Sequence, residues 1–230
     1  MSSIRASGLG VSLDGARILS DVTAELPQRR IAVIGANGSG KSTFVRTLNG
    51  LVRPTEGTIE VAGVDAGAHP RAARERVGFL FSNPDAQILM PTPAEDVALS
   101  LKSAGVERAS RRASALAQLE RFGLAAHADQ PAHSLSGGQK QLLALAAVLA
   151  LRPTVLVADE PTTLLDLGNA RRMADLLIGE AEPVAEQVVI VTHDLDLAAR
   201  CDVALRFSDG ALVEQGAPAD VIARYRAEFA

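Results

Sequence analysis

Features of secreted, membrane-spanning and disulfide-stabilised proteins are scarce in this sequence. Its one cysteine, Cys201, cannot form a disulfide within the chain, so the reducing cytoplasm is the expected compartment. The longest strongly apolar run, residues 142–151, is too short to cross a bilayer, which requires about 20 apolar residues. The start, MSSIRASGLG, contains no apolar core after its arginine, and a secretory signal is therefore not expected.

An excess of charge of either sign is also lacking. Lys+Arg 23 against Asp+Glu 27 gives a net charge of -4, so no basic field favours nucleic acid or an acidic membrane surface. A composition of 47% hydrophobic and 22% charged residues excludes disordered, collagen-like and disulfide-framework chains. A chain of 230 residues is long enough for one substantial soluble domain. Any link to a membrane is expected to go through a partner.

Short apolar runs bounded by turn residues alternate with segments of helical periodicity. The runs that predict strands are residues 30–34, 58–61, 77–81, 155–158, 188–192 and 203–207. The segments that predict helices are residues 41–49, 94–102, 111–122, 137–151, 167–179 and 219–227. Several strand runs are apolar throughout, as in strands covered on both faces. The alternation therefore predicts an α/β fold built on a mainly parallel sheet.

Two parts of the chain depart from this alternation. Residues 84–151 offer several helices in succession and no convincing strand, which predicts a helical lobe inserted into the sheet domain. The first thirty residues contain short alternating stretches broken by glycines and Pro27, which fits a small N-terminal antiparallel β region. We expect a single domain over residues 1–230, with its core formed by residues 1–83 and 152–230.

A glycine-rich loop, Gly35-Ala-Asn-Gly-Ser-Gly-Lys-Ser-Thr43, follows a predicted strand and opens a helical run. This order, with the pattern G-x-x-x-x-G-K-S, is typical of a phosphate-binding loop. Lys41 is expected to reach the β- and γ-phosphates of a nucleotide, and the Ser42 hydroxyl to ligate Mg²⁺. The alternative is a glycine-rich turn that only caps a helix. The residues predicted to bind nucleotide here are Gly35, Asn37, Gly38, Ser39, Gly40, Lys41, Ser42 and Thr43.

Two acidic residues, Asp159 and Glu160, end the apolar run Val155-Leu-Val-Ala. Carboxylates at the end of a buried strand are costly unless a cation or hydrogen bonds compensate for the lost water. We expect Asp159 to hold Mg²⁺ through its water shell, and Glu160 to polarise a water for attack on the γ-phosphate. The alternative is an acidic turn or helix N-cap after the strand.

The pentapeptide Leu135-Ser-Gly-Gly-Gln139 precedes an apolar helical run. The Ser136 hydroxyl and the N–H groups of Gly137 and Gly138, at a helix N-terminus, form a second anion site that suits a γ-phosphate. One fold does not readily bring this loop to the Lys41 of the same chain.

The ordered motifs G-A-N-G-S-G-K-S-T, L-S-G-G-Q, V-L-V-A-D-E and V-T-H-D resemble those of the ATP-binding cassette ATPases across essentially the whole chain. The resemblance implies a P-loop NTPase fold of the RecA-like type that binds ATP and Mg²⁺ and hydrolyses ATP. It also implies a head-to-tail dimer in which Lys41 of one chain and the loop of the other, with Ser136 and Gln139, clamp the same ATP.

Two more residues take their roles from this resemblance. Asp166, in Thr163-Leu-Leu-Asp, resembles the aspartate that links the two sites of the dimer. His193 resembles the switch histidine that contacts the γ-phosphate and positions the attacking water, which gives a catalytic set of Lys41, Glu160 and His193. Taken alone, a histidine such as His193 is more often a capping or surface residue. The histidines that match no functional position, and are expected at the surface, are His69, His127 and His133.

Two positions depart from the family pattern. Ser82 stands where the family has the glutamine of the Q-loop, and its shorter side chain is expected to reach Mg²⁺ or the attacking water only through another water. Leu13 stands nearest to the place of the aromatic residue that stacks on adenine. Because an aromatic–base stack is worth about 1–3 kcal/mol, we expect weaker adenine binding than is usual in the family.

Residues 82–97, S-N-P-D-A-Q-I-L-M-P-T-P-A-E-D-V, resemble a stretch of the energy-coupling factor ATPases. Those ATPases energise micronutrient uptake through a membrane scaffold protein and a membrane substrate-binding protein; this form is most similar to biotin transporters, then to cobalt or nickel transporters. The resemblance implies a peripheral position on the cytoplasmic face of the membrane. The side chains expected to line a groove for an apolar partner helix, or else to be core residues of the lobe, are Gln87, Ile88, Leu89 and Met90.

The alternative function is a regulatory or repair ATPase of the same superfamily that does not act in transport. Such proteins usually carry two cassettes or a long coiled-coil insertion, and 230 residues accommodate neither. A P-loop kinase would lack the loop formed by residues 135–139. A nucleotide sensor that does not hydrolyse ATP would lack an acidic residue at position 160. Both a homodimer and a heterodimer fit the sequence, and in the transport group another polypeptide selects the cargo.

Overall fold

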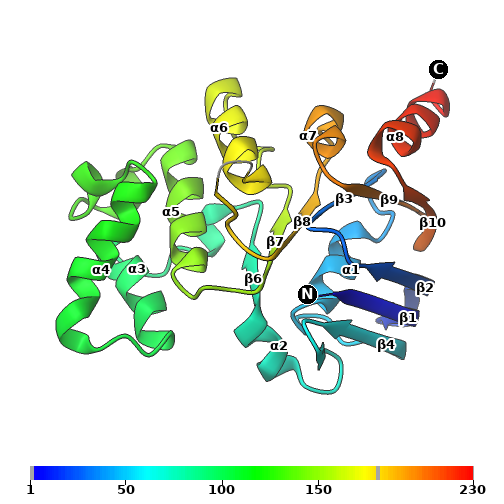
Figure 1. Cartoon of the computed structure of the whole chain (residues 1–230), viewed down its shortest axis with the longest axis horizontal. Coiled ribbons are helices and arrows are strands. Elements are labelled where there is room, and N and C mark those ends of the chain that lie inside the picture. The colour runs from blue at the N-terminus through cyan, green and yellow to red at the C-terminus, as the bar shows by residue number, and fades with distance from the viewer. Residues whose placement is uncertain (1–2, 180–181, 230) are drawn as a thin grey trace.

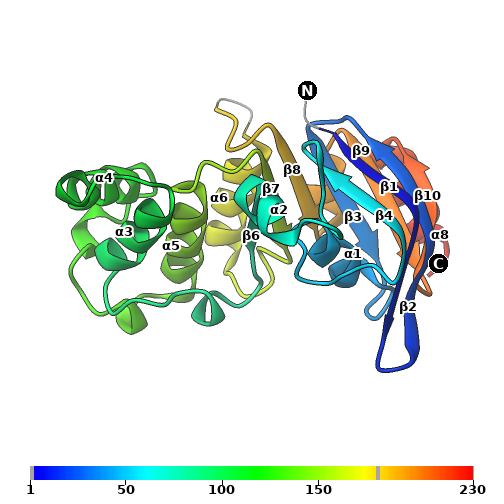
Figure 2. The same cartoon turned by 90° about the horizontal axis from the view of Figure 1, so that it is seen from below.

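The computed structural model describes residues 3–179 and 182–229, which form two sheets with helices packed around them. The larger sheet has the strand order β10-β9-β3-β8-β7-β6 (Figures 1 and 2). Its strands are β3 (Arg30–Gly35), β6 (Val77–Leu80), β7 (Val155–Asp159), β8 (Gln187–Val191), β9 (Val203–Ser208) and β10 (Ala211–Gly216). All neighbouring pairs are parallel except β9 and β10.

A smaller antiparallel sheet lies against the larger one and has the order β2-β1-β4-β5. Its strands are β1 (Ile4–Leu13), β2 (Ala16–Leu26), β4 (Glu56–Val61) and β5 (Val64–Asp65). The antiparallel β region expected in the first thirty residues is therefore confirmed. The strand predicted at 58–61 belongs to this sheet rather than to the parallel one, because it pairs with β1.

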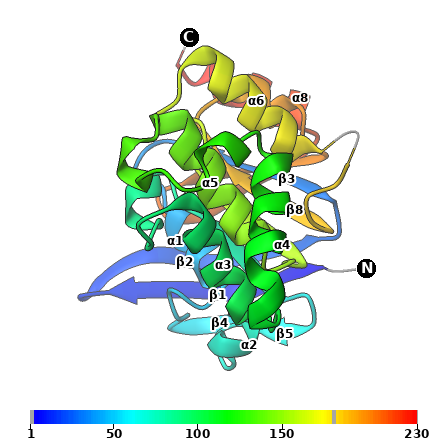
Figure 3. The same cartoon turned by 90° about the vertical axis from the view of Figure 1, so that its left-hand side faces the viewer.

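Some helices pack on the sheets, and the others lie together at one end of the molecule. The α-helices are α1 (Lys41–Thr47), α2 (Pro70–Arg76), α3 (Pro93–Ser103), α4 (Arg108–Arg121), α5 (Gly137–Leu149), α6 (Leu167–Ile178), α7 (Leu195–Ala199) and α8 (Pro218–Ala227). Short 3₁₀ turns are η1 (Pro84–Ala86), η2 (Ala125–His127) and η3 (Ala132–Ser134). Figures 1 and 3 show α3, α4 and α5 side by side at the end away from the antiparallel sheet. Every helix in the described ranges is too short or too polar to span a bilayer.

The parallel strands are buried on both faces, and their side chains alternate between two hydrophobic cores. In β3, Ile31 and Val33 join the core shared with the antiparallel sheet and α1, whereas Ala32 and Ile34 join the core shared with the lobe helices and α6. Strands β7 and β8 alternate in the same way. This double burial explains why these strands are apolar throughout.

The α/β fold with a mainly parallel sheet is as predicted. Helices α2 and α7 and strands β5 and β10 were not predicted: β5 and α7 are very short, α2 buries only Ala73, and β10 carries exposed or half-buried side chains along its whole length. Residues 84–151 contain helices and turns in the structure. The boundary between a lobe and a core at these positions stays a prediction.

Phe44 attaches the first helix after the glycine-rich loop to the sheet. Its side chain is fully buried, and its ring centroid lies 5.0 Å from that of Phe207 on β9. We predict that Phe44→Ala lowers the free energy of unfolding by about 3–5 kcal/mol, because the truncation leaves a cavity between two rigid layers. Denaturant unfolding measures this change. The control, Phe229→Ala, removes a ring that is 73% exposed and is expected to stay within about 0.5 kcal/mol. Equal losses in the two variants would contradict the prediction.

Candidate active site

The loops that follow the parallel strands meet at one edge of the larger sheet. Strands β3, β8, β7 and β6 are neighbours, and the carboxyl ends of parallel strands lie at the same edge. The glycine-rich loop follows β3, His193 follows β8, and Glu160 follows Asp159 at the end of β7. This topology brings together residues that are more than 100 positions apart, as the Ser42–Asp159 hydrogen bond shows.

The glycine-rich loop turns out of β3 at Gly35. The φ of Gly35 is 142°, and a Cβ there would lie 2.2 Å from the carbonyl oxygen of Phe207, so that only glycine fits. The loop ends at Gly40, the N-cap of α1, whose φ is 97°. The polypeptide therefore passes from strand to helix in the narrow turn that a phosphate-binding loop requires.

Lys41 is the first residue of α1 and is 6% exposed. Its Nζ donates to the carbonyl oxygens of Gly35 and Ala36, at 2.8 Å each. Burial lowers the pKa of Lys41, and the carboxylates of Glu160 and Asp159 act in the opposite direction. Since an ammonium group has three N–H donors, one remains to bind an anion such as a phosphate oxygen.

Ser42 and Asp159 place two oxygen ligands side by side. The Ser42 hydroxyl donates to Oδ1 of Asp159 at 3.0 Å, and Asp159 is 4% exposed. Nη2 of Arg46 lies 3.7 Å from Oδ2 of the same carboxylate. A hydroxyl and a carboxylate are ligands that Mg²⁺ takes together with phosphate oxygens and waters. The pair therefore fits Mg²⁺ bound with a nucleotide.

Glu160 and His193 face each other at the ends of neighbouring strands. Oε1 of Glu160 lies 3.1 Å from Nε2 of His193, and Oε2 accepts a hydrogen bond from the Thr163 hydroxyl at 3.0 Å. The backbone of Glu160 has a φ of 54°, and its N–H donates to the carbonyl of Val191 at 3.0 Å. A left-handed conformation is uncommon for residues other than glycine and is found at functional sites whose surroundings hold the strain. The Thr163 hydroxyl thus holds Oε2, whereas Oε1 is buried beside His193 without a hydrogen bond.

One cavity of about 330 Å³ contains most of these groups. The residues that line it are Ile18, Asn37, Gly38, Ser39, Gly40, Lys41, Ser42, Thr43, Glu160 and His193. Sequence reasoning missed Ile18, which is half-buried on β2 and carries no pattern of its own. Leu13, predicted near adenine, is 45% exposed at the end of β1 and does not line this cavity. Its role in binding the base stays a prediction.

The 135–139 loop forms the N-terminus of α5. Ser136 is the N-cap, its Oγ accepts from the N–H of Gln139 at 3.3 Å, and its own N–H donates to Oε1 of Gln139 at 2.9 Å. This reciprocal capping box satisfies the N–H groups of Ser136 and Gln139 and leaves those of Gly137 and Gly138, in the first turn of α5, free of it. A Cβ on Gly138 would lie 2.5 Å from the side chain of Asn169, so a larger residue does not fit there.

This loop borders a second, smaller depression. The residues that line it include Ser82, Gly137, Gln141, Pro161 and Leu164. The two depressions have no lining residue in common, which agrees with the expectation that the loop does not serve the Lys41 of its own chain. Ser82 lies in the second depression and is exposed. Its predicted contact with Mg²⁺ through a water stays a prediction.

Asp166 caps the N-terminus of α6. Its Oδ1 accepts from the N–H of Asn169 at 3.0 Å, and these hydrogen bonds from Asn169 lower the pKa of Asp166. The side chain is exposed, which leaves it accessible to a second chain.

One expectation for the histidines was wrong. His69 and His133 are exposed, as predicted. His127 is half-buried and lies between two glutamine side chains, Gln130 and Gln139, rather than standing free at the surface. The error arose because the partner in α5 is distant in the sequence.

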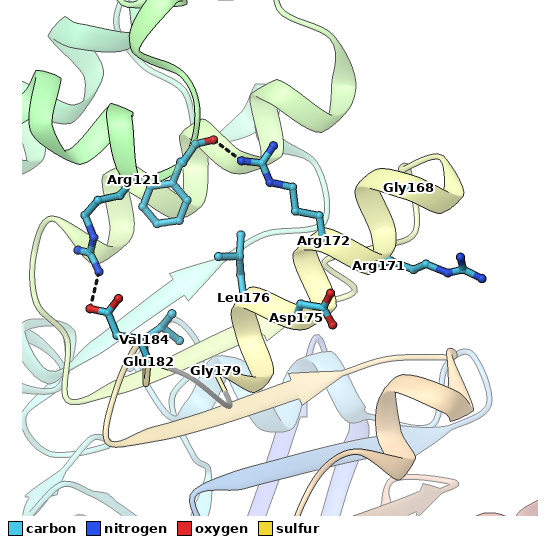
Figure 4. A pocket seen from close by; sticks show the side chains of 10 residues that line it. Arg121, Gly168, Arg171, Arg172, Asp175, Leu176, Gly179, Glu182 and Val184 are labelled. Atoms are coloured by element: carbon cyan, nitrogen blue, oxygen red, sulfur yellow. Dashed lines mark hydrogen bonds and ion pairs between the residues drawn. The ribbon is translucent and has the colours of Figure 1, made fainter.

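A larger cavity, of about 630 Å³, lies elsewhere, between the end of α4 and α6. Its charged side chains are largely occupied: Arg121 pairs with Glu182 at 3.2 Å, and Arg172 donates to the Phe122 carbonyl at 2.8 Å. Figure 4 shows Arg171 pointing away from these side chains. The described residues that line this cavity do not form a phosphate-binding loop. They also do not place a general acid and a general base above such a loop.

Known ATP-binding proteins are similar to this chain over almost its whole length. Residues 19–163 match the family model described as ABC transporter. The chain is 42% identical over 224 residues to the biotin transport ATP-binding protein BioM of Rhizobium etli, and the match covers 97% of each chain. It is similar to the solved structure of cbiO1 from Clostridium perfringens, part of the ABC transporter complex cbiONQ, with a TM-score of 0.85 and 29% identity over 97% of this chain and 92% of that one. The chain is also similar to the solved structure of a dimeric ATP-binding cassette bound to ADP and phosphate. The TM-score is 0.81 and the identity 26%, and the match covers 94% of this chain and 98% of that one.

Leu13 offers a direct test of how the base is held. If Leu13 lies under adenine, Leu13→Tyr supplies the missing stack and tightens ATP binding about five- to a hundredfold, as base stacking energies predict. Calorimetric titration with ATP measures this change, and Leu51→Tyr, at a leucine that is 48% exposed elsewhere, is the matched control. An unchanged affinity in Leu13→Tyr, with weakened binding in Ile18→Ala, would assign the base to Ile18 instead.

Proposed function

This chain belongs to the ABC transporter family as an ATP-binding and ATP-hydrolysing subunit, and from that premise we propose that it energises micronutrient uptake by an energy-coupling factor transporter. The observation that carries the proposal is the exposed Leu89 in a segment that starts from the sheet edge of the active site. It lies between β6, whose end is at that edge, and α3 in the helical lobe. A membrane partner bound there contacts both the site and the lobe.

In the proposed reaction, Glu160 is the general base. Thr163 holds its carboxylate beside His193 and the phosphate-binding loop, where it accepts a proton from the attacking water. Lys41 and the loop N–H groups bind the phosphates, and His193 contacts the γ-phosphate. Ser42 and Asp159 hold Mg²⁺, which neutralises charge on the phosphate oxygens when bound.

The other half of each site comes from a second chain in this proposal. Proteins of this family act as dimers, as does the similar cassette with ADP and phosphate. Ser136 and the N–H groups at the start of α5 bind the γ-phosphate held by the partner's loop, and exposed Asp166 links the two sites. The separation of the two depressions within one chain supports this arrangement.

The segment 82–97 provides the proposed docking surface for a membrane scaffold. A cavity of about 340 Å³ is lined by Ile88, Leu89 and Met90, among others, and Leu89 is 73% exposed. This exposure argues against the alternative that Leu89 is a core residue of the lobe. Gln87 supports the segment instead of lining this cavity, since its side chain bonds the carbonyl of Phe79 and the N–H of Phe81 at 3.0 and 3.1 Å.

Asp96 fixes the shape of the docking segment. It is 5% exposed, and its Oδ1 accepts hydrogen bonds from the N–H groups of Leu89 and Met90 at 2.8 and 3.1 Å. Burial raises the pKa of Asp96, and the two backbone hydrogen bonds partly offset the effect. Leu89 is thus presented on a preformed backbone, which suits the docking of a partner helix, whereas half-buried Ile88 also packs against the core.

We propose biotin as the first candidate cargo and cobalt or nickel ions as the second. The support is the S-N-P-D-A-Q-I-L-M-P-T sequence and the 42% identity to a biotin transport ATP-binding protein over 97% of both chains. A membrane substrate-binding protein would select the molecule, and this chain would sit on the cytoplasmic face of the membrane through its partners.

Glu160→Gln tests the catalytic assignment. The variant keeps the shape of the side chain but cannot accept the proton, so kcat for ATP is expected to fall at least about a hundredfold. ATP binding persists, and the ATP-bound dimer becomes long-lived. Lys41→Ala, in contrast, is expected to weaken ATP binding itself. Steady-state phosphate release and ATP titrations measure both, and wild-type turnover in Glu160→Gln would rule out this base.

Leu89→Glu tests the docking segment. An unpaired carboxylate buried on docking costs several kcal/mol, so the variant is expected to lose co-purification with the membrane proteins and to lose uptake. Because Leu89 is exposed, the melting temperature and basal ATPase rate are expected to match those of the wild type. Val213→Glu, at another exposed apolar residue, is the control for added charge. Normal uptake by a folded Leu89→Glu protein would refute the docking role.

A further inference from the structure

A chain of hydrogen bonds connects His127 to the start of α5. Nε2 of the His127 ring lies 2.9 Å from Nε2 of Gln139, and its Nδ1 lies 3.1 Å from Oε1 of Gln130. Gln139 is also the residue that completes the capping box with Ser136. The half-buried ring thus stands directly behind the loop that is proposed to reach the partner's ATP.

The bonds determine which atoms donate. The N–H of Ser136 donates to Oε1 of Gln139, which fixes the orientation of that amide and turns its NH₂ group toward His127. Nε2 of His127 is then the acceptor, and Nδ1 carries the proton that it donates to Gln130. In this arrangement His127 thus accepts at Nε2 and donates from Nδ1.

The orientation of Gln139 controls the Ser136 hydroxyl. Oγ of Ser136 accepts from the N–H of Gln139, so its own proton remains available for an anion. Without an acceptor at His127, the Gln139 amide loses a partner in a half-buried place and is free to turn, which opens the capping box. The hydroxyl then has no fixed direction.

We propose that His127 is a positioning residue for the ATP site shared between two chains. It acts through Gln139 to hold Ser136 in the direction in which it binds the γ-phosphate on the partner. This inference rests on the proposed function, in which the 135–139 loop completes the partner's site.

The test uses the full chain carrying Glu160→Gln, in which ATP-bound dimers persist, and measures ATP-dependent dimerisation by analytical ultracentrifugation. Adding His127→Leu keeps the bulk of the side chain but removes the acceptor, and is expected to raise the dimer dissociation constant about tenfold. Each dimer contains the Gln139–His127 hydrogen bond twice, and the loss of each is expected to raise the constant by about a factor of three. His127→Gln, whose Oε1 replaces the acceptor at Nε2, is expected to stay within about twofold of the parent. His69→Leu, at an exposed histidine, is the matched control.

Two further measurements separate positioning from a loss of fold. Binding of ATP to the monomer, below the dimerisation concentration, is expected to be unchanged in His127→Leu, since Lys41 belongs to the other cavity. In a chain that already carries Gln139→Leu, His127→Leu is expected to have no further effect on dimerisation, because the path through Gln139 is already cut.

The outcomes distinguish this inference from the proposed function. Dimerisation that is insensitive to His127→Leu, or equally weakened by His127→Gln, overturns the positioning role and leaves the shared site intact. A parent Glu160→Gln chain that does not dimerise with ATP refutes the shared site and this inference with it.

Discussion

The position of the active site depends on the burial of β3 on both faces. Ile31 and Val33 are fixed in the core beneath the antiparallel sheet, while Ala32 and Ile34 are fixed in the core beneath α6 and the lobe. A strand locked from both sides cannot shift its register without exposing one apolar set, since successive side chains point to opposite faces. The turn at Gly35 is therefore held in place, and the phosphate-binding loop begins at a defined point.

The charges of the site depend on this rigidity. Lys41 and Asp159 are buried, and burial of a charge is unfavourable unless hydrogen bonds or opposite charges compensate. The Gly35 and Ala36 carbonyls accept hydrogen bonds from Lys41, and the Ser42 hydroxyl donates one to Asp159, so each charge has a partner within the chain. Groups arranged in advance in this way need little reorganisation when phosphate charge arrives, which is how preorganised sites stabilise a transition state.

The sequence predicted the parts of this arrangement that depend on local patterns. Apolar runs such as 155–158 identify strands buried on both faces, and the glycine-rich loop carries its own geometric requirement at Gly35. Pairing partners depend on distant segments, so the run 58–61 could not be assigned to the antiparallel sheet. The same reason hid His127 and Ile18, whose relevance comes from contacts across the fold rather than from spacing.

The docking segment and the 135–139 loop are connected within one chain by both side chains and backbone. Nζ of Lys140, on α5, lies 2.7 Å from Oδ1 of Asp85, and the side chain of Gln141 donates to the Phe81 carbonyl at 3.0 Å. A backbone hydrogen bond also joins the two regions: the N–H of Ala132, shortly before the 135–139 loop, donates to the carbonyl of Pro91, in the docking segment, at 2.7 Å.

A partner that moves the docking segment must therefore move the start of α5 with it or break these bonds. In the proposed dimer that helix end contacts ATP held by the other chain. Under the proposed function, coupling between cargo movement and hydrolysis passes through these bonds between the docking segment and the start of α5.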